Sequence, residues 1–137
     1  MDRCRDEQRV TPYKMVKEFN KTFSSPKGHF NNRELRTLRV NLIKEEFNEL
    51  MDALVDWNPN PSKVMKEMGD LIYVIIGAAD AWGWDLEEGF RRIHESNMTK
   101  AEEDGTVNRR ADGKILKSSR YSPPILDGLF GKGYVNE

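Results

Sequence analysis

The chain has 137 residues, of which 33% are charged and 37% hydrophobic, with a formal net charge of −1 and one cysteine. This length predicts one domain with a substantial core. The near-zero net charge argues against a nucleic-acid partner, and a single cysteine excludes an internal disulfide framework. No apolar run is long enough for a membrane span, and the first nine residues are too polar for a signal peptide. We therefore expect a cytoplasmic protein without a membrane partner.

The first predicted helix follows a charged stretch, residues 1–10, that we expect to be flexible. Thr11 and Pro12 form a helix start, with threonine as the N-cap and proline at the first helical position. Apolar side chains then recur at helical spacing: Met15, Val16, Phe19 and Phe23. Residues 24–28, which include a proline and a glycine, end this helix.

Two longer helices are predicted next. One begins near residue 31 and ends at the stop signal of residues 58–61. The other runs from Lys63 to Trp82 with Ser62 as its cap. Residues 71–76 are apolar on every side, which is typical of a helix buried all round. Their β-branched side chains leave a strand as the alternative, but the length of the apolar stretch favours a helix.

A fourth helix is predicted from Asp85 to about Asn97, with Asp85 and Glu88 as a variant capping box. Its inward face is expected to carry Leu86, Phe90 and Ile93. The later pair Asp112-Gly113 predicts a hairpin turn. The expected fold is all-α, a four-helix bundle with a short irregular tail and an oligomeric core. A single domain spans residues 11–124, and residues 125–137 are expected to be flexible.

Two acidic motifs interrupt these helices. Glu46 and Glu49 are three residues apart, as are Glu67 and Asp70, so each pair shares a helix face. If the two helices pack face to face, four carboxylates converge, and such a cluster needs a cation to stay ionised. Oxygen ligands favour Mg²⁺ or Mn²⁺.

A simpler explanation exists for each acidic motif. The run from Glu45 to Glu49 is also typical of a solvated helix face. Asp70, however, shares a stripe with apolar residues on the core side, and burying an unpaired carboxylate costs several kcal/mol. Lysines can compensate instead of a metal, and of the three nearby in sequence we expect only Lys63 to share the face of Glu67. Asp80, further along the stripe, is either an acceptor behind the metal ligands or a buried, hydrogen-bonded aspartate.

Cationic and amide side chains follow the fourth helix: Asn97, Lys100, Arg109, Arg110, Lys114 and Lys117. Carboxylates that hold a metal beside lysines and arginines suit a polyphosphate, since the metal takes bridging oxygens and the fixed cations take the rest. The alternative is a solubilising basic tail.

These motifs resemble a known family. Glu45-Glu46-x-x-Glu49 followed by Glu67-x-Gly69-Asp70 is similar to the EExxE…ExxD signature of the all-α nucleoside triphosphate pyrophosphohydrolases. The segments 95–100 and 110–117 resemble the tail of the single-domain MazG-like branch. The resemblance implies a four-helix core assembled as a homodimer or homotetramer. It also implies Mg²⁺- or Mn²⁺-dependent hydrolysis of a nucleoside triphosphate to monophosphate and pyrophosphate, with a role in cleaning or balancing nucleotide pools.

The resemblance also implies roles for individual residues. The metal ligands would be Glu46, Glu49, Glu67 and Asp70, with Glu45 behind them or acting as the base. The substrate contacts would be Asn97, Lys100, Arg110, Lys114 and Lys117. Members of this branch often carry histidine where this chain has Asn20. That helix shapes the pocket for the nucleobase of the substrate, so the resemblance does not decide which nucleobase is preferred. The alternatives are a dUTPase, a phosphoribosyl-ATP pyrophosphohydrolase, or a non-catalytic helical oligomer that binds nucleotide.

Overall fold

The computed structural model describes residues 9–131 and divides the chain into two compact units. Among the described residues, the first unit contains residues 9–84 and Gly131, and the second is Asp85–Phe130. Within residues 9–131 the regular elements are four α-helices, which confirms the all-α prediction and excludes the strand considered for residues 71–76. Among these described helices, none has the length and apolar character needed to cross a membrane.

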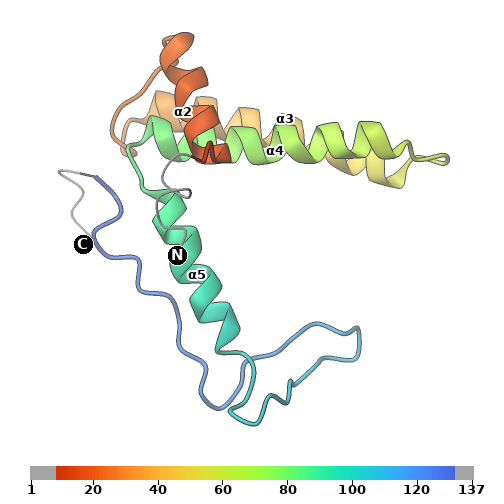
Figure 1. Ribbon diagram of the computed structural model, residues 1–137. Coiled ribbons are helices and arrows are strands. Elements are labelled where there is room, and N and C mark those ends of the chain that lie inside the picture. Colours follow the sequence, from red (N-terminus) through yellow and green to blue (C-terminus); the bar gives the residue numbers. More distant parts are fainter. Residues whose placement is uncertain (1–8, 132–137) are drawn as a thin grey trace. The chain divides into compact units, whose positions relative to one another are not determined.

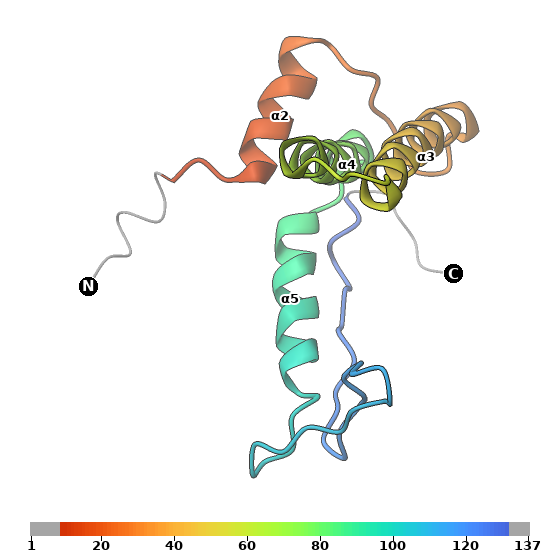
Figure 2. The same cartoon turned by 90° about the vertical axis from the view of Figure 1, so that its right-hand side faces the viewer.

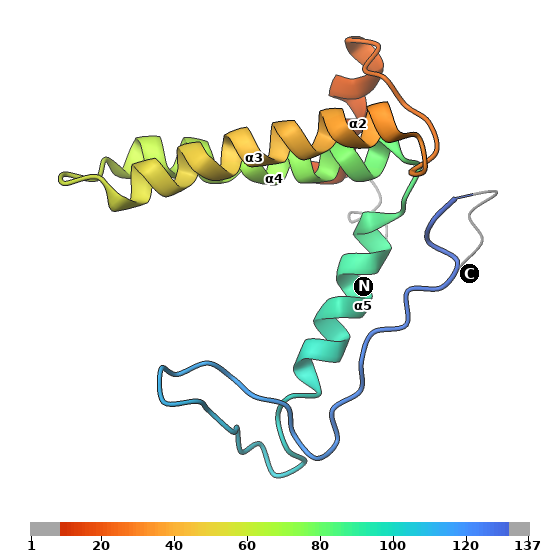
Figure 3. The same cartoon turned by 180° about the vertical axis from the view of Figure 1, so that it is seen from behind.

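The first unit consists of three helices: α2 (Pro12–Thr22), α3 (Arg33–Val55) and α4 (Pro61–Ala81). Helices α3 and α4 lie side by side and run in opposite directions, joined by a short turn (Figures 1 and 3). Helix α2 crosses the C-terminal half of α4 (Figure 2), where the Phe19 ring lies 5.3 Å from the Tyr73 ring. The α3–α4 hairpin is therefore the long element on which the acidic motifs face each other.

Side-chain caps start all four helices, as the sequence predicts for Thr11 and Asp85. The predicted start of the third helix is wrong by two residues. Asn60, not Ser62, is its N-cap, and the Asn60 side chain accepts a hydrogen bond from the Ser62 amide at 2.9 Å. Pro61 is the first helical residue because its fixed φ suits that position and no intrahelical partner is lost. The preceding Asn-Pro repeat thus starts a helix as well as ending one.

The core of the described chain is small. Its buried apolar residues are Val16, Leu35, Leu50, Ala53, Ile76, Ala78, Ala79, Ala81 and Leu129. Residues 71–76 of α4 are not buried all round in the single chain, because Ile72 is 55% exposed and Ile75 is 41% exposed. Phe90, expected to face inward, is 61% exposed. The second unit, to which Phe90 belongs, leaves most of this side chain exposed.

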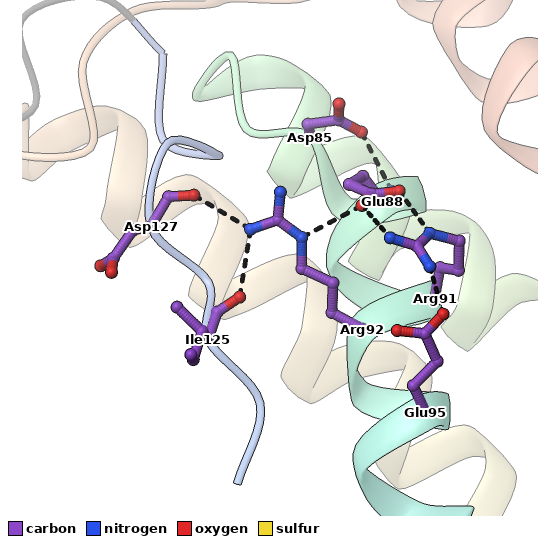
Figure 4. A network of polar contacts seen from close by, with 7 residues as sticks. All are labelled: Asp85, Glu88, Arg91, Arg92, Glu95, Ile125 and Asp127. Atoms are coloured by element: carbon purple, nitrogen blue, oxygen red, sulfur yellow. Dashed lines mark hydrogen bonds and ion pairs between the residues drawn. The ribbon is translucent and has the colours of Figure 1, made fainter.

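The second unit contains α5 (Leu86–Met98) and the segment that follows it. The Asp85 side chain accepts a hydrogen bond from the Glu88 amide, as predicted. The reciprocal bond of a capping box is not formed, because the Asp85 amide donates to the Leu129 carbonyl and not to the Glu88 side chain. Figure 4 shows Glu88 bound by Arg91 and Arg92, while Arg92 also donates to the carbonyls of Ile125 and Asp127.

The segment after α5 carries two isolated antiparallel bridges, between Ala101 and Val107 and between Arg109 and Ile115. The second bridge encloses the predicted turn, in which Gly113 has a φ of 91°. The turn prediction is thereby confirmed. The C-terminus was predicted to be flexible from residue 125. In the structure residues 125–129 contact α5, and residues 132–137 lie outside the described chain. The predicted flexible N-terminus, residues 1–10, lies almost wholly outside it as well.

Candidate metal centre

Three carboxylates meet between α3 and α4. Glu46 and Glu49 come from α3 and Glu67 comes from α4, and one oxygen from each lies within 4.8 Å of the others. The i, i+3 spacing places the first two on one face of α3, and the antiparallel hairpin brings Glu67 opposite them. Glu67 is buried, Glu46 is half-buried and Glu49 is exposed, so the cluster runs from the helix interface to the surface. The structure therefore brings together three of the four predicted ligands directly.

Two oxygens of this cluster are buried without hydrogen-bond partners in the described chain: Oε2 of Glu46 and Oε2 of Glu67. A buried, unpartnered carboxylate oxygen is costly unless a cation or water binds it. Burial, and then the neighbouring Glu49, raise the pKa of Glu46. A set of carboxylate donors at this spacing fits a hard divalent cation such as Mg²⁺ or Mn²⁺.

Asp70, the fourth predicted ligand, lies at the edge of the cluster and is half-buried. Its negative charge also raises the pKa of Glu46. Lys66 Nζ lies 2.6 Å from Asp70 Oδ2 and 3.7 Å from Glu67 Oε1. The prediction that Lys63 is the lysine on this face is therefore wrong. Lys66 and Asp70 are four residues apart and therefore neighbours on the helix surface, which explains why Lys66 is the lysine that contacts the cluster.

Two further residues of the acidic motifs, Glu45 and Gly69, lie at the surface of the described chain. Glu45, the predicted base or supporting acid, is exposed on α3 beside Glu46. A Cβ added at Gly69 would meet nothing within 4 Å in the described chain. The α4 surface between Glu67 and Asp70 is thus open to a ligand or to another chain.

A second polar cluster joins all three helices of the first unit. Asn20 Nδ2 donates to Asp80 Oδ2 at 2.9 Å and to the Gly77 carbonyl at 3.3 Å. Asp80 is therefore hydrogen-bonded, as one of the two alternatives predicts, but it is half-buried rather than buried. Arg39, only 5% exposed, lies beside Gly77, where an added Cβ would be 3.1 Å from the guanidinium. Burial lowers the pKa of Arg39, and the charge of Asp80 opposes that shift.

Arg39 is not among the residues that the sequence motifs predict to be functional. The signal was its position on the inward stripe of α3, four residues after Leu35 and seven before Glu46. An arginine on such a stripe needs a compensating negative charge, and the carboxylate whose charge acts on it is Asp80 on α4.

The predicted substrate contacts from Asn97, in the last turn of α5, to Lys117 all belong to the second unit, whereas the carboxylates belong to the first. Asn97 is exposed and Lys100 is half-buried. Arg110 pairs with Asp112 at 2.6 Å, and Lys117 Nζ lies 4.9 Å from the centre of the Tyr121 ring. The Lys114 amide bonds to Asp112 and its side chain is exposed. The structure thus gives Arg110 and Lys117 local partners in the second unit.

Comparisons with known proteins agree with this arrangement. The sequence profile of the family described as phosphoribosyl-ATP pyrophosphohydrolase matches residues 16–97, which is more than half of the chain and includes every carboxylate of the cluster. An uncharacterised protein of Acanthamoeba polyphaga mimivirus is 34% identical over 87 residues. That alignment covers 58% of this chain and 34% of the viral protein, so the chain spans about a third of the length of this curated relative.

The matched helices α3 and α4 are the ones that bring the three glutamates together. Proteins of this superfamily depend on metal in general, and the cluster supplies the oxygen donors that a metal needs. The chain belongs to the phosphoribosyl-ATP pyrophosphohydrolase family, within the all-α, MazG-like pyrophosphohydrolase superfamily.

Proposed function

We propose that the chain is a metal-dependent nucleoside triphosphate pyrophosphohydrolase. It would cleave a ribo- or deoxyribonucleoside triphosphate between the α- and β-phosphates, releasing the monophosphate and pyrophosphate, and so clean or balance nucleotide pools. The observation that carries this proposal is the convergence of Glu46, Glu49 and Glu67 within 4.8 Å. Family membership supports the hydrolysis of an acid anhydride, and the cluster supplies the charge needed beside a polyphosphate.

The proposed role of each carboxylate follows from its burial. Glu67 and Glu46 each present an oxygen without a partner, and we assign both to the metal together with Glu49. Asp70 joins them from the edge once Lys66 gives way. A bound divalent cation would polarise water and a phosphate oxygen in this centre. Exposed Glu45 is the residue that can take a proton from the attacking water without leaving the metal ligands incomplete.

The cationic side chains would neutralise the leaving pyrophosphate, whose charge grows toward the transition state. Lys100 and Lys114 are the strongest choices for this role, with Asn97 as a hydrogen-bond donor. Arg110 must first leave Asp112, and Lys117 must leave Tyr121, so both would contribute less. We keep Asn20 as a proposed contact toward the base, although its amide is already bonded to α4.

A second candidate substrate is phosphoribosyl-ATP, because the matching family is described by that substrate. It carries the same triphosphate and would give the same pyrophosphate product. A dUTPase activity, or nucleotide binding without catalysis, uses the same scaffold but has no separate observation in its favour.

A product assay tests the reaction. The purified chain is incubated with each common NTP and dNTP, with dUTP and with phosphoribosyl-ATP, first in Mg²⁺ and then in Mn²⁺, and ³¹P NMR identifies the products. Pyrophosphate with a monophosphate is expected, and Glu67→Gln should abolish its release while Glu34→Gln, at an exposed acid near the start of α3, should not. Orthophosphate with a diphosphate would refute the reaction class, and no turnover of any substrate would favour the non-catalytic alternative.

We also propose that the protein works as a homodimer or homotetramer. Large apolar side chains are exposed on the described hairpin: Phe47, Leu54, Met65, Met68, Ile72 and Ile75. Soluble monomers rarely expose so many together, and a second copy of the hairpin would cover them. Sedimentation at micromolar concentration should give a multiple of 15.9 kDa, and a stable species at 15.9 kDa would refute the assembly.

A further inference from the structure

Lys66 is a cation of the first unit that is already in contact with the carboxylate cluster. Its Nζ lies 2.6 Å from Asp70 Oδ2 and 3.7 Å from Glu67 Oε1. The hydrogen bond to Asp70, and then the charges of Asp70, Glu67 and Glu46, raise the pKa of Lys66. The ammonium group therefore lies in the field of acids from both α3 and α4, and it offsets part of their negative charge.

The Lys66 side chain is free to leave this contact. It is 65% exposed and the Asp70 side chain is 37% exposed, so water screens the ion pair and weakens it. Gly69 is three residues after Lys66 and therefore its neighbour on the helix surface. A Cβ added at Gly69 would meet nothing within 4 Å in the described chain. The long lysine side chain thus has open space beside it into which it can turn.

The Lys66 ammonium and a divalent cation need the same carboxylate oxygens. Lys66 precedes Glu67 directly in the chain, so its ammonium group stays close to the cluster even after it has left Asp70. A lysine ammonium group has three donors on a flexible stem and is a common ligand of phosphate. A phosphate chain held at the cluster is therefore the anion to which the released ammonium group can turn.

We infer that Lys66 exchanges Asp70 for a phosphate oxygen of the substrate when a cation occupies the carboxylates. This inference rests on the proposed function and adds to it a substrate contact from the first unit, whereas Lys100 and Lys114 belong to the second. The exchange makes metal and phosphate binding mutually favourable, because the phosphate chain takes up the ammonium group that otherwise competes for Asp70.

Two calorimetric titrations test this exchange: Mn²⁺ alone, and inorganic tripolyphosphate in saturating Mn²⁺, a probe that needs no choice of nucleobase. Lys66→Ala should bind Mn²⁺ alone several-fold more tightly than wild type and should bind tripolyphosphate at least tenfold more weakly. Lys66→Arg, which keeps a cation on a long stem, should restore most of the tripolyphosphate affinity. Lys63→Ala removes the same charge from an exposed position of α4 and should change either affinity less than twofold.

The opposite signs of the two effects distinguish an exchanging lysine from a merely structural one, whose loss would weaken both ligands. Three outcomes would overturn the inference: no binding of tripolyphosphate to wild type in Mn²⁺, unchanged binding in Lys66→Ala, or equal weakening in Lys63→Ala. Circular dichroism checks that each variant remains helical.

Failure of this inference and failure of the proposed function give different results. If wild type releases pyrophosphate from a nucleotide but Lys66→Ala binds tripolyphosphate as well as wild type does, the activity stands and the lysine contact is wrong. If wild type hydrolyses no nucleotide but binds tripolyphosphate through Lys66, the contact stands and the proposed activity is wrong.

Discussion

Lys66 and Asp70 are joined by a contact of 2.6 Å between Nζ and Oδ2, directly beside the three converging glutamates. The hydrogen bond to Asp70 raises the pKa of Lys66, so this lysine stays charged through the physiological range. It also lies 3.7 Å from Glu67. Because Lys66 is 65% exposed, the pair contributes little to stability, and its main effect is on the electrostatics of the cluster.

Lys66 competes with a metal for the same carboxylates. Lys66→Ala is therefore expected to tighten Mn²⁺ binding several-fold, as measured by calorimetry, since no ammonium group then has to be displaced from Asp70. Lys63→Ala removes an equal charge from the same helix, away from this contact, and should change the affinity less. Weaker Mn²⁺ binding in Lys66→Ala would mean that the lysine supports the metal site rather than competing with it.

Divalent metal should stabilise the fold. The carboxylates repel one another in metal-free protein, so millimolar Mg²⁺ should raise the melting temperature by mass action. Glu67→Gln should lose this response and should melt higher than wild type in EDTA, because a buried negative charge has gone. Glu34→Gln should keep the response. If wild-type protein melts at the same temperature with and without Mg²⁺, the metal assignment is wrong.

Local spacing was sufficient to predict much of this site. The i, i+3 acids and two long helices joined by a short turn predict that Glu46, Glu49 and Glu67 face one another, and they do. The contact between Lys66 and Asp70 also follows from spacing, although the prediction chose Lys63. What spacing cannot give is the charge that offsets the burial of Arg39, because Asp80 is on another helix and acts on Arg39 only after α3 and α4 have packed.

An exposed apolar face on α4 of a single chain is what the prediction of an oligomeric core requires. Residues 71–76 are apolar on every side, and four helices in 137 residues leave little to cover them. The structure shows that a single chain leaves Ile72 and Ile75 exposed. The start of α4 was missed because Pro61 both prevents continuation of one helix and favours the start of the next.

The buried Arg39 should depend on Asp80. Asp80→Ala removes the negative charge that offsets the burial of this guanidinium and also the acceptor of the Asn20 amide, and we expect a loss of about 1–3 kcal/mol in the free energy of unfolding. Urea denaturation measures this loss. The double variant Arg39→Met/Asp80→Ala should lose less than the sum of the two single variants. Additive losses would show that the two side chains are independent.

Glu88 should titrate far below an ordinary glutamate. Hydrogen bonds from Arg91 and Arg92 lower the pKa of Glu88 from 4.5 to about 2 (Figure 4). Since the folded-state pKa is the lower one, the stabilisation is complete above about 4.5 and is lost as the pH falls toward 2. A ¹³C NMR titration of the Glu88 carboxyl should show this midpoint.

The arginine variants give the control for that titration. Arg91→Ala/Arg92→Ala should move the Glu88 midpoint up toward 4.5, the ordinary value. Arg120→Ala removes an arginine of the same unit whose side chain bonds to the Ala101 carbonyl instead, and it should leave the midpoint in place. An unshifted midpoint in the double variant would show that the arginines do not cause the low pKa.

Truncation after Pro124 should destabilise the second unit. The removed segment supplies the Ile125 and Asp127 carbonyls that bind Arg92, and the Leu129 carbonyl that binds the Asp85 amide at the start of α5. It also supplies the Leu129 side chain, which is 8% exposed. A helix of the length of α5 is marginal in water without such packing. We therefore expect faster amide hydrogen exchange throughout α5 in the truncated chain.

Two matched variants separate packing from chain length. Leu129→Ala keeps every residue but removes the buried side chain, and should lower the free energy of unfolding of the second unit by about 2–3 kcal/mol. Truncation after Gly131 keeps all the contacts named above and should leave exchange in α5 unchanged. If truncation after Pro124 also leaves the exchange of α5 unchanged, residues 125–129 do not stabilise this helix. In that case α5 forms without these residues, and their contacts with Arg92 and Asp85 do not stabilise it.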